Sequence, residues 1–182
     1  MACDITTGRV EPCKDAVGGL KNVYLINYDD LTQSAVTYDA TNTDVIELLD
    51  GTPSNVNSYK FELKGANSYE QTINSSRENG TTFFEGVMSL TLKKQDLATH
   101  KQVKLLAFGR PIIVLEDNNG NFQVAGLEWG AEITGGTITS GAAMGDLNGY
   151  TLTFTTQERL PANFMEATNE AGLNTAGLIV NA

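Results

Sequence analysis

The feature that most constrains the fold is an alternation of apolar and polar residues in two separate segments. In FFEGVMSLTLKK (residues 83–94) and YTLTFTTQE (residues 150–158), large apolar residues recur at every second position, with mostly threonine, serine or charged residues between them. A period of two indicates strands with one buried and one polar face. A chain of 182 residues is long enough to bury a sizeable core between such strands. We therefore predict a mainly β protein.

Two further strands are expected in the first third of the chain. KNVYLINYDD (residues 21–30) carries apolar residues at both odd and even positions, which predicts partial burial on both faces. YKFELKG (residues 59–65) puts Tyr59, Phe61 and Leu63 on one side. We expect this strand to form a long hairpin with residues 83–94, with the polar stretch 67–82 as the connection and tip.

The second half of the chain predicts one helix and a group of strands. Asp96 is placed to cap a helix over residues 96–108, and Gly109 to end it in a left-handed conformation. We expect the second half of this helix to be the better buried. PIIVLEDNNGNFQVAGLEW (residues 111–129) predicts a strand, a turn at Asn119-Gly120 and a second strand.

A third strand segment and a loop follow this hairpin. GAEIT continues the strand pattern, and Trp129, just before it, is taken to stand alone in a strand. GGTITSGAAMGDLNG (residues 135–149) predicts a flexible loop of about fifteen residues, because glycine and small polar residues dominate it.

These elements predict a β-sandwich or barrel of antiparallel strands, flanked by one helix and by extended terminal arms. Residues 1–20 form the expected N-terminal arm, residues 21–160 the β domain and residues 161–182 the C-terminal arm. After Pro161 the apolar residues are spaced too widely for a self-sufficient helix or strand. We therefore expect the C-terminal arm to lie on a neighbouring subunit.

Charge is unevenly distributed along the chain. The net charge is −10, which argues against a surface that grips nucleic acid, because phosphate binding needs clustered lysine and arginine. No lysine or arginine lies between Asn22 and Tyr59, whereas eight of the twelve basic residues lie between Lys60 and Arg110. One interpretation is an ordinary solvated acidic surface; the other is that opposite faces of one subunit attract each other.

The residues that usually carry chemistry do not form a recognisable site. His100 has no nucleophile nearby in the sequence, and Phe122 stands where a calcium loop beginning at Asp117 needs glycine. Cys3 and Cys13 lack the further ligands of a zinc site and are expected to be free thiols. We expect no catalytic residue, no metal and no cofactor. No stretch is long and apolar enough to cross a membrane, and the start lacks a secretory signal, so synthesis in the cytoplasm is expected.

One run of the sequence resembles a known family. LKKQDLATHKQVKLLAFGRPIIVLEDNNGNFQVAGLEWGAEITGGTITSGAAMGDLNGYTLTFTTQERLPANFM is similar to the core of tail tube proteins of tailed bacteriophages. The resemblance is carried by a helix that leads into a strand, by the DNNGNF hairpin with GLEWG after it, and by the GDLNGYTLTFTTQERLPANF strand. The first third of the chain has no match in this family.

The resemblance implies a structural role. Tube proteins of this kind fold as a β-sandwich or barrel flanked by a helix, assemble into rings, usually of six, and stack these rings into a conduit for DNA. They have no catalytic residues. The implied partners are other copies of the same chain and other tail or virion proteins, with DNA passing through without specific binding and no membrane involved. The implied location is the virion tail, after synthesis in the host cytoplasm.

Other functions stay open at this point. They are another virion component such as a head decoration or head-to-tail connector protein, a sugar-binding or adhesive β-sandwich, and an enzyme. The type VI secretion tube shares the fold, so a contractile relative also stays open. For the tube, we expect contacts at the hairpin tip, at four lysines of the middle segment and at the start of the C-terminal arm. The candidate residues are Ser75, Ser76, Arg77, Glu78, Asn79, Lys93, Lys94, Lys101, Lys104, Phe164 and Met165.

Overall fold

The computed structural model describes residue 5, residues 7–51 and residues 55–181, and in them the chain is mainly β. A 3-10 turn (Tyr28–Asp30) follows the first strand. The helices and strands are β1 (Leu20–Asn27), β2 (Leu31–Tyr38), β3 (Val45–Gly51), β4 (Val56–Glu62), β5 (Ser68–Ser76), β6 (Thr81–Lys93), α1 (Leu97–Phe108), β7 (Pro111–Asp117), β8 (Phe122–Ala125), β9 (Ala131–Thr139), β10 (Gly149–Glu158), β11 (Asn163–Met165), α2 (Glu170–Thr175) and β12 (Leu178–Asn181).

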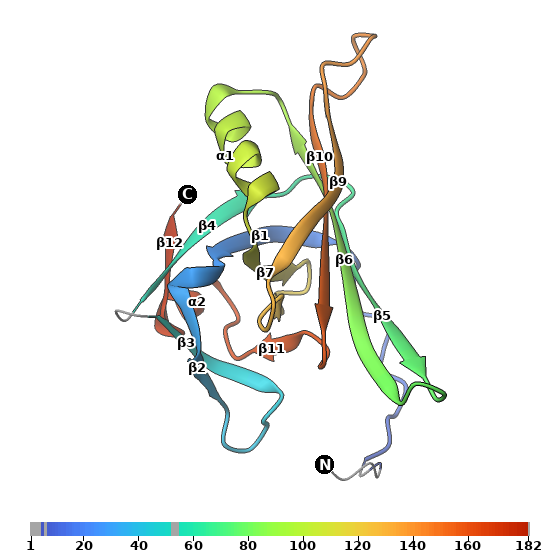
Figure 1. Cartoon of the computed structure of the whole chain (residues 1–182), viewed down its shortest axis with the longest axis vertical. Helices are drawn as coiled ribbons and strands as arrows, with labels where there is room; N and C mark the ends of the chain where they lie inside the picture. Colours follow the sequence, from blue (N-terminus) through green and yellow to red (C-terminus); the bar gives the residue numbers. More distant parts are fainter. Residues whose placement is uncertain (1–4, 6, 52–54, 182) are drawn as a thin grey trace.

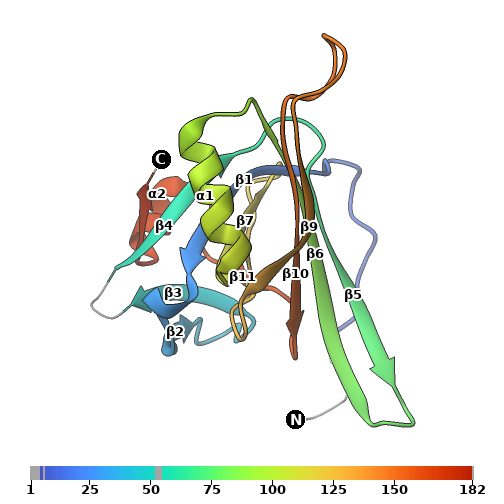
Figure 2. The ribbon, with the colours of Figure 1, turned by 45° about the horizontal axis from the view of Figure 1, so that its top comes forward.

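The strands form two sheets. The larger has the order β12-β4-β1-β7-β8-β11-β3-β2, and the smaller has the order β5-β6-β10-β9. Figures 1 and 2 show the smaller sheet standing along one side of the molecule, with α1 next to it and the curved larger sheet behind. The predicted mainly β fold with one flanking helix of some length is confirmed.

Strands β1 and β7 lie at the centre of the molecule and are buried on both faces. Tyr24 and Val114 belong to a core cluster on one side, which the larger sheet encloses together with α2. Val23 and Ile113 belong to a second cluster on the other side, between the two sheets. Burial on both faces explains why residues 21–30 lack a clean alternation, and it confirms the prediction for that strand.

The smaller sheet packs on the second cluster through its alternating apolar residues. Met88 and Leu90 of β6 and Tyr150, Leu152 and Phe154 of β10 are buried there. Leu90 lies opposite Leu152, and Met88 lies opposite Phe154, in an antiparallel register. The alternation predicted for residues 83–94 and 150–158 therefore places the expected side chains in the core.

Helix α1 begins as predicted and ends differently. Asp96 accepts a hydrogen bond from the Thr99 backbone N–H at 2.7 Å, which is the expected N-cap. Gly109 is extended, with φ −91° and ψ 173°, so the predicted left-handed end is wrong. Its N–H still reaches the Leu106 carbonyl oxygen, and Pro111 enters β7 two residues later. Only Val103 of this helix is buried, with Leu106 packed beside it, so burial favours the second half as expected.

The predicted partner of β6 is wrong. Residues 56–62 form β4, which pairs with β1 and β12 in the larger sheet. The strand beside β6 is β5, which lies inside the stretch that we predicted to be a polar connection. Its side chains alternate only weakly in polarity, because much of the hairpin extends past the core and is exposed. Strand β5 is therefore held in place by its hydrogen bonds to β6 and not by a hydrophobic pattern of its own.

The loop predicted for residues 135–149 is shorter than expected. Strand β9 continues to Thr139, and the connection to β10 spans residues 140–148. A side chain at Gly136 would collide with the carbonyl oxygen of Thr151, so this glycine serves close strand packing. Trp129 lies in the turn before β9, and its predicted place in a strand is wrong.

The C-terminal segment belongs to its own domain, so the prediction of an arm over residues 161–182 is wrong. Strand β11 inserts between β8 and β3, and β12 pairs in parallel with β4. Leu173, Ala176 and Leu178 lie in the first core cluster. The short strands β11 and β12 form without a hydrophobic periodicity of their own, because neighbouring strands of the larger sheet supply their hydrogen-bond partners. Residues 7–19, by contrast, are exposed and form no helix or strand before β1.

Candidate functional site

The predicted hairpin residues lie together at the tip of β5 and β6. Ser75 and Ser76 end β5, and Arg77, Glu78 and Asn79 form the exposed turn. The Asn79 backbone N–H donates to Ser76 Oγ at 3.3 Å. Strand β6 pairs with β5 on one side and with β10 on the other, and β10 ends opposite Phe84. The β5–β6 hairpin therefore continues beyond the end of β10. Figures 1 and 2 show it projecting past the body of the molecule.

The four predicted lysines separate into two pairs. Lys93 and Lys94 lie where β6 ends, whereas Lys101 and Lys104 lie on α1. All four are exposed, and none lies within 4.0 Å of a carboxylate in the described part of the chain. Lys93 lines a hollow of about 670 Å³ between β4, the end of β6 and the first turns of α1.

Phe164 and Met165 occupy opposite sides of the short strand β11. Phe164 is 48% exposed, which leaves it accessible to another molecule. Met165 lies in the first core cluster and is 6% exposed, so its prediction as an assembly residue is wrong. Consecutive residues of a strand point to opposite faces, so both cannot contribute to one surface.

The smaller sheet has an outward face that is rich in threonine, which we call the threonine face. Hydroxyl groups pair across its strands, with 2.6 Å between Thr137 Oγ1 and Thr151 Oγ1 and 2.8 Å between Thr134 Oγ1 and Thr155 Oγ1. Only one residue of the four strands is basic, Lys93 at the end of β6. By strand alternation and register, the threonine face includes Ser68, Glu70, Thr72, Glu85, Val87, Ser89, Thr91, Glu132, Thr134, Thr137, Thr139, Thr151, Thr153, Thr155 and Gln157, with Lys93 at its end.

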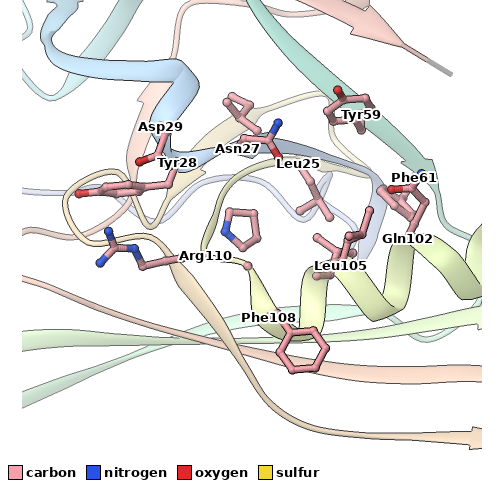
Figure 3. A pocket seen from close by; sticks show the side chains of 14 residues that line it. Leu25, Asn27, Tyr28, Asp29, Tyr59, Phe61, Gln102, Leu105, Phe108 and Arg110 are labelled. Atoms are coloured by element: carbon pink, nitrogen blue, oxygen red, sulfur yellow. The ribbon is translucent and has the colours of Figure 1, made fainter.

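A second groove lies between α1 and strands β1 and β4 and has a volume of about 690 Å³ (Figure 3). Leu25, Phe61 and Leu105 line it, and Asp29 and Arg110 are the only charged residues of its lining. The Arg110 guanidinium carbon lies 4.0 Å from the centre of the Tyr28 ring. This arrangement offers contacts to an apolar side chain, and its lining contains no cysteine, histidine or serine.

Two buried carboxylates hold the central strands and a turn in place. Glu116 on β7 accepts hydrogen bonds from Lys21 at 2.6 Å, from Asn22 at 2.6 Å and from Tyr24 at 3.1 Å. Glu158 accepts from the backbone N–H groups of Gly126 and Glu128 and so fixes the turn that carries Trp129.

These carboxylates have opposite pKa shifts. Burial raises the pKa of Glu116, but the hydrogen bonds from Lys21, Asn22 and Tyr24 outweigh it and leave that pKa below its ordinary value. Burial raises the pKa of Glu158, and the backbone N–H groups around it offset this only in part. Glu116 therefore stabilises the fold in its charged form, whereas the charged form of Glu158 is disfavoured by its burial.

Replacing Glu116 with glutamine is expected to lower the melting temperature at neutral pH, because the amide cannot form the ion pair with Lys21. A carboxylate with a lowered pKa stabilises the fold above its ordinary pKa, and this contribution is lost as the pH falls through the lowered value. The gap in melting temperature between wild type and variant should therefore narrow in acid. Thermal unfolding followed by circular dichroism across that range measures it, and a gap independent of pH would contradict the assignment.

The described residues contain no group of three histidine, cysteine, aspartate or glutamate side chains that could hold a metal ion. No helix among them has the length and apolar character needed to span a bilayer. The His100 ring lies 6.2 Å from the Tyr150 ring, and Cys13 is exposed with a free thiol. Cys3 lies outside the described residues.

Comparisons of the chain with family models, curated proteins and solved structures gave no match in any of the three. Sequence reasoning identified the hairpin tip, the lysines and the polar side of residues 150–158. It did not join that polar side to the neighbouring strands in one face, and it missed the two grooves beside α1. The threonines at alternate positions of β10 were a visible signal for that face. The grooves have no such signal, because they bring together residues of β4 and α1 that lie far apart in the sequence.

Proposed function

We propose that this protein is the tail tube protein of a tailed bacteriophage and that its copies form rings that stack into a conduit for DNA. The observation that carries the proposal is the threonine face, which presents hydroxyl groups together with the carboxylates of Glu70, Glu85 and Glu132. Such a face suits the wall of a DNA channel. Carboxylates repel phosphates over about 8 Å at physiological salt, and neutral hydroxyls add no attraction between ions.

The two edges of the smaller sheet support assembly into a ring. Within the described part of the chain, β5 and β9 each pair with a strand on one side only, which leaves backbone groups on the other side available for pairing. Pairing of β5 in one copy with β9 in the next would extend the sheet from subunit to subunit. A closed ring would leave no edge of the smaller sheets unpaired, and their threonine faces would line the bore.

The resemblance to tail tube proteins supports the same proposal. It covers Leu92–Met165, a stretch that contains α1 and contributes β7, β8 and β11 to the larger sheet and β9 and β10 to the smaller sheet. In this proposal the protein is located in the virion tail after synthesis in the host cytoplasm. Its partners are other copies of itself and other tail proteins.

Trp129 favours a second candidate, a sugar-binding β-sandwich. Its ring is 47% exposed and borders a hollow of about 340 Å³ that Glu132, Thr155 and Gln157 also line. An aromatic ring beside polar groups is a common arrangement for stacking against a sugar. Only one such ring is present at this hollow, so the tube remains the main proposal.

Electron microscopy of the purified full-length protein tests the proposal. Hollow tubes built of stacked rings are expected. Hydrogen exchange measured by mass spectrometry should then show slower exchange in β5 and β9 of the tubes than in the monomer, because their free edges become paired. Monomers at every concentration tested, together with glycan binding that is lost in Trp129→Ala, would favour the sugar-binding candidate instead.

A further inference from the structure

The hollow that Lys93 lines has a positive and partly apolar surface, and we call it the lysine groove. Lys60 and Lys64 also line it, together with Tyr59 and Phe61. Lys60 pairs with Glu170 at 2.6 Å, and Lys64 pairs with Glu62 at 3.4 Å. Lys93 has no carboxylate within 4.0 Å among the described residues. Its exposed neighbour Lys94 interacts electrostatically with Asp96 but forms no ion pair within that distance. The groove therefore has a positive charge that its own chain leaves unbalanced.

The turn between β2 and β3 has the opposite charge and a fixed shape. Asp39 Oδ1 accepts hydrogen bonds from the backbone N–H groups of Thr41 and Asn42, at 2.7 and 2.6 Å. The Asp39 N–H donates to the Val45 carbonyl oxygen at 3.0 Å. Asp44 is exposed, and neither aspartate forms an ion pair with a described residue. The turn thus presents two carboxylates on an ordered loop without a basic residue.

The two surfaces lie toward opposite ends of the molecule. Figure 1 places the β2–β3 turn at its lower end, and the junction between β6 and α1, where Lys93 and Lys94 lie, near its top. Figure 2 shows the same separation after rotation. A chain cannot join its own two ends in this arrangement. Two different surfaces that fit each other on separate copies make a head-to-tail contact, which propagates when it does not close into a ring.

We propose that the β2–β3 turn of one copy docks in the lysine groove of the next copy and forms the contact between successive rings. The inference rests on the self-assembly proposed above and identifies its partner surfaces. Asp39 and Asp44 then approach Lys93 and Lys94 at the rim, while the turn packs against Tyr59 and Phe61. The contact is screened by salt, because its charges lie at the surface.

Charge exchange in the full-length protein tests this contact. The variant K93E/K94E reverses the groove, and D39N/D44K reverses the turn while the asparagine keeps an oxygen that can cap the turn. Each is expected to weaken self-association at low salt by about tenfold or more, which corresponds to about 1.4 kcal/mol or more. The fourfold variant K93E/K94E/D39N/D44K, in which the charges are exchanged, should recover most of it. Sedimentation velocity measures association, and circular dichroism verifies that each variant is folded.

The matched variant is K101E/K104E, which makes the same change in net charge on α1. The sequence also predicts these two lysines as contacts, but they do not line the groove, so this inference expects them to lie outside the contact between rings. It should alter association by less than about threefold, in line with exposed charges outside a contact. Equal losses in both lysine pairs, or no recovery in the folded fourfold variant, would overturn the inference. Microscopy separates this result from the proposed function. If self-association is lost and recovered with the charge exchange but no tubes form, the contact is supported and the tube proposal is refuted. If tubes form and the charge variants do not affect them, the tube proposal is supported and the contact is refuted.

Discussion

A chain that ends at Thr168 is expected to lose its fold, although its sequence suggests a detachable arm beyond that point. The truncation removes α2 and β12, and with them Leu173 and Leu178 from the first core cluster. It also leaves the backbone N–H groups of Leu49 and Val56 without their acceptors, the carbonyl oxygens of Ala176 and Gly177. Buried backbone groups without partners add to the cost of the lost apolar contacts.

A single substitution tests the same point with less disruption. Leu173→Ala should lower the free energy of unfolding by about 2–5 kcal/mol, because the side chain is fully buried and its removal leaves a cavity. Ile179→Ala is the matched control on β12, where the side chain is 45% exposed, and it should cost less than about 1 kcal/mol. Urea unfolding measures both variants. A truncated chain that still unfolds cooperatively with native circular dichroism would show that the segment is an arm after all.

The parts of the fold that could be predicted from the sequence are those whose pattern is local. Strand β10 alternates because one face packs on the core and the other does not, and Asp96 caps α1 through a contact three residues away. The partner of β6 could not be predicted in this way. Strand β4 has the stronger alternation, yet it pairs with β1, because pairing depends on contacts between residues far apart in the chain.

The prediction for the C-terminal segment, residues 161–182, was wrong for a related reason. Each of its pieces is short, and β11 has only three residues, so no periodic signal can form. Its structure depends on β3, β4 and β8, which supply hydrogen bonds along their edges. Burial of Met165 follows from this insertion, and no property of the segment alone indicates it.

In the candidate site, too, the features that depend on a local pattern could be predicted and those that depend on distant residues could not. Exposure of Arg77 and Glu78 follows from a polar turn and was predicted, as was exposure of the lysines. The lysine groove and the threonine face were not predicted as surfaces. The groove requires β4 to lie beside α1, and the face requires four strands in one register, neither of which is encoded in a single stretch.

Shortening the β5–β6 hairpin is expected to leave the domain folded and to abolish or shorten its tubes. Replacing Ser75–Thr82 with Asn-Gly would join Asn74 to Phe83, which lie opposite each other, through a two-residue turn that suits a hairpin. The removed residues contribute no side chain to either core cluster. The melting temperature of the monomer should therefore stay nearly unchanged, which thermal unfolding measures.

The expected loss of assembly follows from what the hairpin exposes. The hairpin projects past the body of the molecule. Ile73, which is 65% exposed just before the tip, stays in the shortened variant, so this variant removes the reach of the hairpin and its polar tip. In the proposed tube, the tip reaches a neighbouring ring or subunit and becomes ordered through Arg77 and Glu78. Arg77→Gln/Glu78→Gln is the matched control, because it keeps the length of the hairpin and removes only its charges. Electron microscopy measures tube length for both variants. Tubes of normal length from the shortened protein would show that the hairpin is surface only. Loss of tubes in the shortened protein alone would assign the contact to the length of the hairpin and not to the charges of Arg77 and Glu78.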